Sequence, residues 1–423
     1  MAEIAAPRGT HDILPAESSA WRWLLQTHAG IAESFGYRPI ETPIIESTEL
    51  FARGVGVETD IVEKQMFTFT DRGGRSLSLR PESTAGVVRA VLGARLDQER
   101  RPVRVHYQGP MFRAERPQAG RQHQFTQVGV ECIGERSPEL DAEVIEIAWR
   151  FFDALRLTGV RLQVNTLGDA EDRIRYRAAL VSYYTPLRDR LCDDCKRRLD
   201  INPLRLLDCK KDADLAAGAP VIWELLDAGS KEFFNAVLTS LEQAGVIAHV
   251  NHRIVRGLDY YADTVFEFWH DSLHGAQNSL GGGGRYDGLA EILGLPPSPG
   301  TGYALGVERI LMVGQRLGVI PAPDRDCDVV VCSVDSPQAH HAASLARDLR
   351  GAGLRVVLDV SDRRLDRKLR AADRLGALAA VIVGEDEVRD GTAVVRDLAE
   401  HAQQRVSATD VAAAVTRTVE TRA

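Results

Sequence analysis

Cysteine and long apolar runs are both scarce in this sequence of 423 residues. Six cysteines are too few for a disulfide framework in so long a chain, which is typical of proteins from a reducing cytoplasm. No run approaches the roughly 20 apolar residues that a membrane-spanning helix needs. The opening MAEIAAPRGTHDILP has no basic segment followed by an apolar one, so the sequence predicts no secretory signal. We therefore expect a cytoplasmic protein without a membrane partner.

Glycine-rich phosphate loops are absent as well. The chain contains no GxxxxGK[ST] motif and no Gly-Lys pair. The four glycines at 281–284 do not continue as GxGxxG, because Tyr286 and Asp287 stand where the last glycine would be needed. If the protein uses a nucleoside triphosphate, side-chain cations rather than a glycine-rich backbone must hold the phosphates.

The overall charge gives little guidance about partners. The formal net charge is -8, which by itself does not suggest a nucleic acid. Contact with phosphates depends on where the cations lie rather than on their sum. Hydrophobic residues make up 44% of the chain, which is enough for a large core and more than one domain.

The first 320 residues predict an antiparallel sheet flanked by helices. Apolar residues recur at helical spacing over 17–35, and Gly36 can end that helix. Strand-like runs then follow, and short polar turns between several of them favour antiparallel pairing. These runs cover residues 37–45, 65–70, 76–79, 103–108, 124–133, 162–165 and 264–269. Residues 171–245 are mostly helical and charged, and we interpret them as an insertion.

A separate small domain is predicted near the end of the chain. The Pro-containing connector IPAPDRD is followed by strands and helices in regular alternation, which is typical of an α/β domain. The strands are expected over 328–334, 355–360 and 379–383, and the helices over 338–349, 363–375 and 408–419. The predicted fold is therefore an α+β domain over residues 1–322, followed by a C-terminal α/β domain over 325–423.

The most informative stretch is GPMFRAERPQAGRQHQFTQVGVECIG, which reads as two strands joined by a polar loop. On the second strand, the period of two places Phe125, Gln127, Gly129 and Glu131 on one face. Gln127 and Glu131 then stand about 13 Å apart, at roughly 3.3 Å per residue. Because Gly129 has no side chain, we expect a trough floored by backbone, which suits a small molecule with two polar ends. A solvated sheet face with incidental charges gives the same pattern, so both interpretations stay open at this point.

The first strand of this pair places Arg113 and Glu115 on one face, so Arg113 is expected to project over the same trough. A strand with FRAE, a polar loop and a strand with QF resembles motif 2 of class II aminoacyl-tRNA synthetases. The resemblance implies that Arg113 contacts the α-phosphate of ATP and that Arg121 of the loop reaches the γ-phosphate. It implies that Phe125 stacks on the adenine beside Glu115. The loop, with Gln118 and Arg121, is expected to face the acceptor end of the tRNA.

Two further segments resemble the other motifs of these synthetases. In GYALGVERILM, an apolar strand turns through Gly306 into a helix whose first turn presents Arg309, which resembles motif 3. The helix over 17–35 and the strand over 37–43 resemble motif 1, which builds the dimer interface in the family. The resemblance therefore implies a homodimer. The HIGH-type and KMSKS-type signatures of class I synthetases are missing from the sequence.

Four segments are similar to histidyl-tRNA synthetases in particular: RGLDYYADTVFEF, GGGGRYDGL, PRGTHDILP and RPESTAG. The resemblance implies a histidine–tRNA ligase that uses L-histidine, ATP with Mg²⁺, and the histidine tRNA. Arg113, Arg256 and Arg309 are its expected catalytic residues, because a carboxylate that approaches an anionic triphosphate needs cations at the α-phosphate. In this family the arginine that matches Arg256 does the work of a metal, and the substrate carboxylate is the nucleophile.

Recognition of histidine requires a partner for each nitrogen of its ring. Glu131 is expected to accept from one ring N–H, and the Tyr261 hydroxyl to meet the other nitrogen. Because Tyr260 and Tyr261 are adjacent in a strand-like segment, one of them is expected to be merely structural, and Tyr261 is favoured as the direct contact. The resemblance completes the histidine-binding set with Glu82 and Thr84 at the α-amino group, Ser83 between them, Gln127 at the carboxylate, Tyr260 and Tyr286 as walls, and Arg113 and Arg256.

Three cysteines raise the question of a metal site. Cys192 and Cys195 have the CxxC spacing of zinc ligands, and Cys209 follows them. A structural zinc site needs four ligands, and no further Cys or His follows at partner spacing. We therefore expect free thiols in a helical insertion, and no zinc or other metal bound by the protein. Cys327 and Cys332 lie in an apolar strand and are expected in the core.

Cations also gather on the predicted helix over 363–375. A solvated charged face is the usual explanation for such a run, but a terminal α/β domain in a synthetase implies anticodon binding. Arg364, Arg367 and Lys368 are therefore expected to contact tRNA phosphates, through interactions that weaken with salt.

Two other functions fit parts of this pattern. Non-catalytic paralogues of these synthetases act as regulatory, histidine-sensing subunits of the enzyme that starts histidine biosynthesis. They usually lack the anticodon-binding domain and parts of the RGLDYY signature, whereas both are expected in this chain. A class II ligase for another amino acid conflicts with Glu131 and with the histidine-specific segments.

Overall fold

The computed structural model describes residues 4–56, 59, 62, 65–115, 121–255, 260–273, 278–323 and 325–422. The chain divides into two compact units, Met1–Pro321 and Ala322–Ala423. Each unit has its own hydrophobic core. Within the described ranges, no helix has both the length and the apolar character that a membrane crossing requires.

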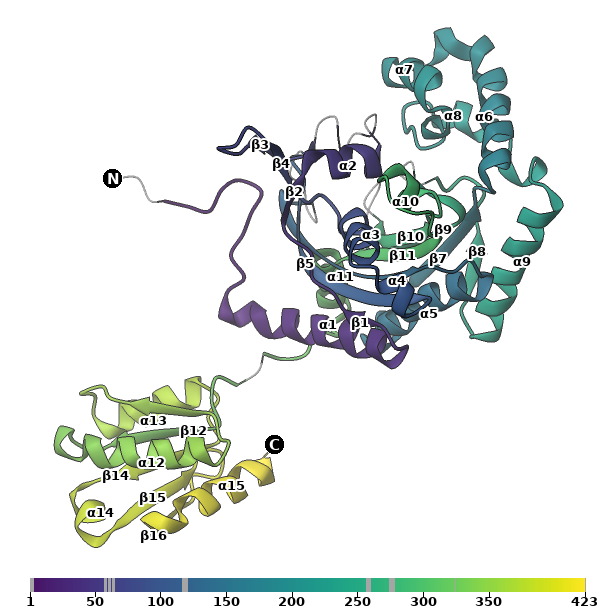
Figure 1. Cartoon of the computed structure of the whole chain (residues 1–423). Coiled ribbons are helices and arrows are strands. Elements are labelled where there is room, and N and C mark those ends of the chain that lie inside the picture. Colours follow the sequence, from purple (N-terminus) through teal and green to yellow (C-terminus); the bar gives the residue numbers. More distant parts are fainter. Residues whose placement is uncertain are drawn as a thin grey trace. The chain divides into compact units, whose positions relative to one another are not determined.

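An eight-stranded sheet forms the base of the first unit, with the strand order β1-β5-β6-β11-β10-β9-β7-β8 (Figure 1). The strands are β1 (Arg38–Pro39), β5 (Val103–Phe112), β6 (Gln124–Ile133), β7 (Val160–Thr166), β8 (Ala248–Val250), β9 (Ala262–His270), β10 (Ser279–Arg285) and β11 (Gly300–Gly306). Pairing is antiparallel from β5 through to β7, and the edge strands β1 and β8 pair in parallel. The predicted antiparallel sheet with flanking helices is therefore confirmed in its central strands.

One face of this sheet is covered by three helices, α1 (Pro15–Ser34), α5 (Pro138–Ala154) and α11 (Val307–Leu317). Every second side chain of β6, namely Val128, Val130 and Cys132, is buried in the core beneath them. The side chain of Ser137 accepts from a backbone N–H at the start of α5, and α11 ends at Gly318 in the left-handed region with φ of 67°. This face is the main apolar core of the unit.

The opposite face of the sheet receives the other alternating residues of β6, which are Gln127, Gly129 and Glu131. Above it lie α2 (Thr48–Val55), α3 (Thr84–Gly93), α4 (Leu96–Glu99), α10 (Leu289–Ile292) and a small sheet of β2 (Ile45–Ser47), β3 (Thr68–Thr70) and β4 (Ser76–Leu79). Val87 of α3 and Val105 of β5 pack in the same cluster on this side. The polar residues of β6 are thus enclosed between the sheet and α3.

The segment between β7 and β8 is the predicted helical insertion, drawn in teal in Figure 1. It consists of α6 (Ala170–Tyr184), η2 (Thr185–Arg190), α7 (Asp193–Ile201), η3 (Pro203–Leu206), α8 (Ala213–Ala217), η4 (Ile222–Glu224) and α9 (Ala228–Gln243). The side chains of Asp169 and Asp227 cap the first turns of α6 and α9. Helix α9 packs against α5, which attaches the insertion to the main core.

The second unit is a five-stranded sheet with the order β13-β12-β14-β15-β16 and helices on both faces. Its elements are β12 (Val329–Ser333), η6 (Ser336–Gln338), α12 (Ala339–Gly351), β13 (Val356–Asp359), α13 (Leu365–Arg374), β14 (Ala379–Val383), α14 (Glu385–Asp390), β15 (Thr392–Asp397), β16 (Gln403–Ser407), η7 (Ala408–Asp410) and α15 (Val411–Arg422).

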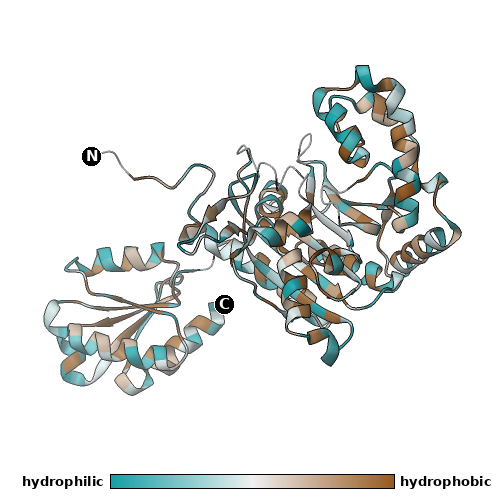
Figure 2. Ribbon diagram, turned by 45° about the horizontal axis from the view of Figure 1, so that its top comes forward, coloured by the Kyte–Doolittle hydropathy of each residue, from teal (hydrophilic) through white to brown (hydrophobic). Residues whose placement is uncertain are grey.

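The alternating pattern of this unit is confirmed as an α/β fold. Leu345 of α12 and Val415 of α15 pack with Val331 on one face, and Ala372 of α13 packs with Val330 on the other. The strands are coloured mainly brown in Figure 2, as expected for a buried sheet. The antiparallel strands β15 and β16 were not predicted, because β16 is short, polar and largely exposed.

Candidate active site

The centre of the site is the carboxyl group of Glu131, which lies on β6 and is fully buried. It receives hydrogen bonds from Thr84 Oγ1 at 2.8 Å and from the Tyr286 hydroxyl at 2.5 Å, and the Tyr107 hydroxyl donates over 3.4 Å. Burial raises the pKa of Glu131 to about 8, although the hydroxyls of Tyr286 and Thr84 oppose the shift. The carboxyl of Glu131 therefore binds a proton more readily than an ordinary glutamate does, and its neighbours are hydroxyls that can donate or accept.

Two glycines make room for this arrangement. Gly302 of β11 stands opposite Glu131, and a Cβ atom there would collide with the carboxylate. Gly129 stands opposite Tyr107, and a Cβ atom there would collide with the Tyr107 ring. The expected open trough over Gly129 is therefore wrong. Directly opposed residues of antiparallel strands lie close on the same face, so the ring of Tyr107 covers the space that Gly129 leaves.

Two adjacent tyrosines line the same cluster. Tyr260 and Tyr261 are 3% and 6% exposed, and their rings lie 4.7 Å apart. The ring of Tyr260 also lies 5.9 Å from that of Tyr286, in an edge-on orientation. The expectation that a strand would separate the pair between core and surface is wrong, because both residues precede β9, which begins at Ala262.

The start of α3 brings Glu82, Ser83 and Thr84 to this cluster. The carboxylate of Glu82 accepts from the backbone N–H of Thr84 at 2.6 Å and of Ala85 at 3.1 Å, so it caps the helix. Burial raises the pKa of Glu82 against these hydrogen bonds. The hydroxyl of Ser83 instead donates to Met111 Sδ at 3.6 Å. Glu82 and Thr84 thus belong to the cluster through their polar groups, and Ser83 serves as the small residue between them.

Arg113 follows the end of β5 and lies between this cluster and an aromatic side chain. Its Nε donates to the carbonyl of Pro81 at 3.0 Å. Its guanidinium carbon lies 5.1 Å from the centre of the Phe125 ring. Burial lowers the pKa of Arg113, which nevertheless remains far above neutral pH for a guanidinium. These contacts place Arg113 beside the segment that leads into α3 and beside Phe125 of β6.

Arg113, Arg121 and Arg309 come from separate elements and lie close enough for their charges to interact. Arg309, in the first turn of α11, donates from Nη1 to the carbonyl of Ser279 at 2.6 Å. Arg121 pairs with Glu115 at 2.8 Å. Burial and the nearby charges of Arg121 and Arg113 lower the pKa of Arg309, while Glu115 opposes the shift. Like charges gathered in one place favour the binding of a polyanion.

Two further polar residues, Gln127 of β6 and Glu308 of α11, lie near the start of β6. Gln127 is 9% exposed, and its side-chain oxygen has no hydrogen-bond partner among the described residues. Glu308 accepts from the backbone N–H of Thr126 at 2.7 Å, and burial raises its pKa to about 6. Since a buried polar atom without a partner is costly, the amide of Gln127 is suited to a ligand or water.

Sequence reasoning did not single out two buried residues near this site. One is Tyr107, for which the only signal was its register opposite Gly129. The other is Arg80, whose guanidinium donates to the carbonyls of Thr42 and Pro110, each at 2.9 Å. Arg80 therefore fixes the backbone that leads into α3 and into the end of β5. Two residues that were singled out, Arg256 and Gln118, lie outside the described residues.

Comparison with known proteins decides which family this arrangement belongs to. Residues 9–171 and 211–310 match the family model of histidyl-tRNA synthetase, and residues 328–418 match that of an anticodon binding domain. The chain belongs to the histidyl-tRNA synthetase family. The resemblance of the four signature segments is thereby confirmed.

Similar members of the histidyl-tRNA synthetase family match over nearly the whole chain. A histidine–tRNA ligase of Pelotomaculum thermopropionicum is 46% identical and covers 95% of this chain and 94% of the relative. One of Halalkalibacterium halodurans is 43% identical and covers 99% and 98%. The crystal structure of apo S. aureus histidyl-tRNA synthetase is similar with a TM-score of 0.84, 33% identity and coverage of 99% and 100%. The regulatory paralogue is less well supported than the ligase by these relatives.

In the unit that matches the anticodon-binding domain, one expected tRNA contact is wrong. Lys368 is only 3% exposed, and its Nζ donates to the carbonyl of Ser333 at 2.9 Å. It lies one turn before Ala372 on the face of α13 that packs against the sheet, so it is not a surface cation. Arg364 and Arg367 are exposed, as a contact with tRNA requires.

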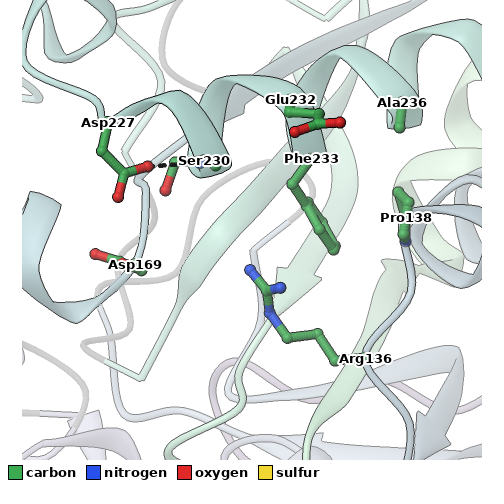
Figure 3. Close-up of a pocket in the computed structure, with 9 residues that line it drawn as sticks. Arg136, Pro138, Asp169, Asp227, Ser230, Glu232, Phe233 and Ala236 are labelled. Atoms are coloured by element: carbon green, nitrogen blue, oxygen red, sulfur yellow. Dashed lines mark hydrogen bonds between the residues drawn. The ribbon is translucent and has the colours of Figure 1, made fainter.

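The insertion of this family member shares a pocket with the body of the unit (Figure 3), and none of the residues that line it belongs to the cluster around Glu131. It has a volume of about 460 Å³ and lies where α6 and α9 begin. Arg136 and Phe233 point toward one another inside it, with the guanidinium carbon 4.3 Å from the ring centre (Figure 3). Arg136 is also paired with Asp263 of β9 at 3.0 Å, so it links this wall of the pocket to the main sheet.

The cysteines of the insertion have a neighbour that the sequence did not reveal. Cys192, Cys195 and Cys209 lie together with Asp212, and one potential ligand atom from each falls within 4.8 Å of the others. The expectation of no zinc depended on the lack of a fourth ligand, and that premise is wrong. Asp212 was missed because only Cys and His were considered as the fourth residue.

Proposed function

We propose that this chain is a histidine–tRNA ligase. It joins L-histidine to ATP as histidyl-adenylate with release of pyrophosphate, and then transfers the histidyl group to the 3′ end of the histidine tRNA. The observation that carries the proposal is the buried carboxyl of Glu131 among the hydroxyls of Thr84, Tyr107 and Tyr286, next to a group of arginines.

The ring of histidine is selected by Glu131. One ring N–H donates to the carboxylate of Glu131, and the hydroxyl of Tyr261 meets the other nitrogen. An analogue without the N–H leaves buried polar groups unpaired, which supports discrimination of about 10⁴.

The backbone end of histidine is held at the start of α3 and on β6. Glu82 uses its two oxygens to cap α3 and keeps further lone pairs for the α-ammonium group, to which the hydroxyl of Thr84 is adjacent. The unpaired amide of Gln127 binds the carboxylate end. Tyr260 and Tyr286 form the walls, with ring centres 5.9 Å apart.

ATP is held by cations and one aromatic ring. Arg113 contacts the α-phosphate, Arg121 the γ-phosphate, and Arg309 lies on the far side of the nucleotide. Phe125 stacks on the adenine beside Glu115. Arg121 is paired with Glu115 in the described structure, so ATP replaces that partner when it binds. ATP enters as its magnesium complex, and the arginines stabilise the charge that develops in the transition state.

The first chemical step needs no nucleophile from the protein. The carboxylate of histidine attacks the α-phosphorus, the bond to pyrophosphate breaks, and pyrophosphate leaves. Arg113 and Arg256 stand on either side of the α-phosphate and offset its repulsion of the approaching carboxylate. In the second step the terminal ribose 3′-hydroxyl attacks the histidyl carbonyl, and AMP leaves.

The proposal also covers the contacts with tRNA, the oligomeric state and the cellular compartment. Arg364, which directly precedes α13, and Arg367, on the exposed face of α13, contact phosphates of the tRNA, and Gln118 and Arg121 face its acceptor end. The protein acts in the cytoplasm as a homodimer through α1 and the following β1.

A charging assay separates this proposal from a histidine-sensing regulatory function. Purified protein is incubated with ATP, labelled histidine and the histidine tRNA, and acid-precipitable label is counted. The ligase forms histidyl-tRNA, and a tRNA for another amino acid serves as the control that stays uncharged. Binding of histidine by calorimetry without any charging would instead identify a sensor.

A further inference from the structure

We propose that the helical insertion holds a structural zinc ion, bound by Cys192, Cys195, Cys209 and Asp212. Three thiol sulfurs and one carboxylate oxygen lie within 4.8 Å of one another there. The site is independent of the proposed ligase reaction, because none of these residues belongs to the cluster around Glu131. Cys195, Cys209 and Asp212 are each less than a tenth exposed, so the site is enclosed by the protein.

The spacing of the ligands has the form of two matched pairs. Two residues separate Cys192 from Cys195, and two residues likewise separate Cys209 from Asp212. Structural zinc sites commonly combine two such CxxC pairs, each presented by a tight turn or the start of a helix. Here Cys192 precedes α7 and Cys195 lies in its first turn, while Asp212 directly precedes α8. The fourth position of the pattern is therefore a carboxylate, which zinc also accepts.

The distances within the cluster suit tetrahedral coordination. Ligand bonds of about 2.3 Å to sulfur and about 2.0 Å to oxygen place neighbouring sulfurs roughly 3.8 Å apart and a sulfur and an oxygen roughly 3.5 Å apart. The sulfurs of Cys192 and Cys209 lie 3.8 Å apart, and the sulfur of Cys209 lies 3.8 Å from Asp212 Oδ2. A disulfide would instead require the sulfurs to approach to about 2.05 Å.

The orientation of Asp212 also favours a ligand role over a capping role. Asp169 and Asp227 stand before α6 and α9, and their side chains cap those helices. Asp212 has the same position before α8, but its carboxylate makes no capping hydrogen bond there. It turns toward the cysteines and accepts from the Cys192 backbone N–H at 3.1 and 3.3 Å. A backbone N–H that orients a ligating carboxylate is a common feature of metal sites.

The insertion has a structural need for such a link. Helix α7 has 9 residues, η3 has 4 and α8 has 5, and helices of this length are not stable in isolation. The four ligands come from the starts of α7 and α8 and from the turn between η3 and α8. One ion would therefore connect the short elements to one another, as metals do in other small modules with limited cores.

Zinc content of the full-length protein tests the proposal. The untagged protein is saturated with zinc chloride, passed through a desalting column, and measured by mass spectrometry of the metal against the protein concentration. We expect about one zinc per chain, since four ligands hold one ion. Less than about a tenth of a zinc per chain would overturn the proposal, because structural sites retain zinc through desalting. A low zinc content together with fewer free thiols would show that the cysteines form disulfides instead, which would also overturn the proposal.

Variants locate the ion. The double variant C195S/C209S should lose the zinc, and the matched control C332S, which changes a buried thiol of the second unit, should keep it. If the double variant keeps as much zinc as the unchanged protein, the ion lies elsewhere and the proposal is wrong. In D212C a thiolate replaces the carboxylate as the fourth ligand, so this variant can be tested even if C195S/C209S does not fold. Cobalt bound to D212C should show a stronger thiolate-to-cobalt absorption than cobalt bound to the unchanged protein, and equal absorption would exclude Asp212 as a ligand.

Discussion

The hydroxyl of Tyr286 donates a hydrogen bond to the carboxyl of Glu131 over 2.5 Å. Both side chains are almost completely buried, and they come from the turn after β10 and from the last residues of β6. The bond joins the GGGGRYDGL segment to the motif 2 strand, which are far apart in the sequence. It therefore fixes the carboxyl that we propose as the partner of the histidine ring.

Removal of this hydroxyl should weaken the use of histidine. In Y286F, Glu131 loses its shortest hydrogen bond, and a buried polar group left without its partner costs about 1 to 3 kcal/mol. We expect kcat/KM for histidine to fall by about 10-fold to 100-fold in pyrophosphate exchange, since 1.4 kcal/mol corresponds to tenfold. The control is Y176F, because the buried Tyr176 hydroxyl donates to the carbonyl of Pro220 in the insertion. Equal kinetics for Y286F and Y176F would contradict the role of Tyr286.

The close approach of Gly302 to Glu131 gives a second prediction. In G302A the new methyl group collides with the carboxylate, so the carboxyl or the strand must shift. We expect a loss of stability of about 1 to 3 kcal/mol, as for overpacked cores, together with weaker binding of histidine. Urea denaturation and calorimetric titration with histidine measure the two effects.

Gly306 offers the matched control on the same strand. The nearest atoms to a Cβ there are 3.8 and 4.0 Å away, which leaves room for a methyl group. G306A should therefore unfold at nearly the same urea concentration as the unchanged protein. If both variants were equally destabilised, the general loss of glycine in β11 would explain the result, and the contact with Glu131 would not.

The raised pKa of Glu131 predicts a dependence of stability on pH. The carboxyl titrates at about 8 in the folded protein against 4.5 as the ordinary value. Between these values the folded state binds a proton that the unfolded state has released, so the contribution of Glu131 to stability falls as pH rises. The variant E131Q has no such titration. We therefore expect its melting temperature to rise relative to the unchanged protein from pH 5 to pH 8, as measured by calorimetry.

An exposed carboxylate provides the control for this pH series. Glu242 lies on the surface of α9, and E242Q should show no comparable trend across the same buffers. A constant difference in melting temperature between E131Q and the unchanged protein at every pH would mean that Glu131 does not carry the raised pKa.

Arg285 of the GGGGR segment should contribute to the free energy of unfolding. It and Asp141 are both fully buried, and they are joined at 2.6 and 3.2 Å through two hydrogen bonds. In R285A the buried carboxylate of Asp141 loses its partner, which costs about 3 to 5 kcal/mol in other proteins. The exposed pair of Arg188 and Asp200 is the control, and R188A should cost far less stability than R285A because solvent screens that pair. Urea denaturation compares the two, and similar losses would contradict the structural role of Arg285.

Much of the fold could be predicted from periodicity. The strand over 124–133 agrees with β6 at both ends, because its alternation of polar and apolar residues matches a sheet with two different faces. Strand β10 was not predicted, because four glycines disfavour a strand by propensity. The packing explains them, since a Cβ on Gly283 would collide with the backbone of Gly302 on the neighbouring strand.

The candidate site depends on contacts between distant segments, and these could be predicted only in part. The resemblance to the family brought together Glu82, Thr84, Glu131 and Tyr286, whose hydrogen bonds span up to 155 residues of sequence. Tyr107 could not be found in this way, because its position above Gly129 depends on the exact register of β5 and β6. Lys368 was misplaced because a run of cations does not show which face of α13 is buried.

The most direct test of the proposed ligase function is histidine-dependent exchange of labelled pyrophosphate into ATP. It is measured for the unchanged protein and for E131Q without any tRNA. We expect exchange that requires histidine and is not supported by other amino acids, and we expect E131Q to lose most of it, because a carboxylate partner for the imidazole is gone. Folded protein that shows no exchange with histidine would contradict the ligase proposal. Full exchange by E131Q would contradict the role of Glu131 in selecting histidine.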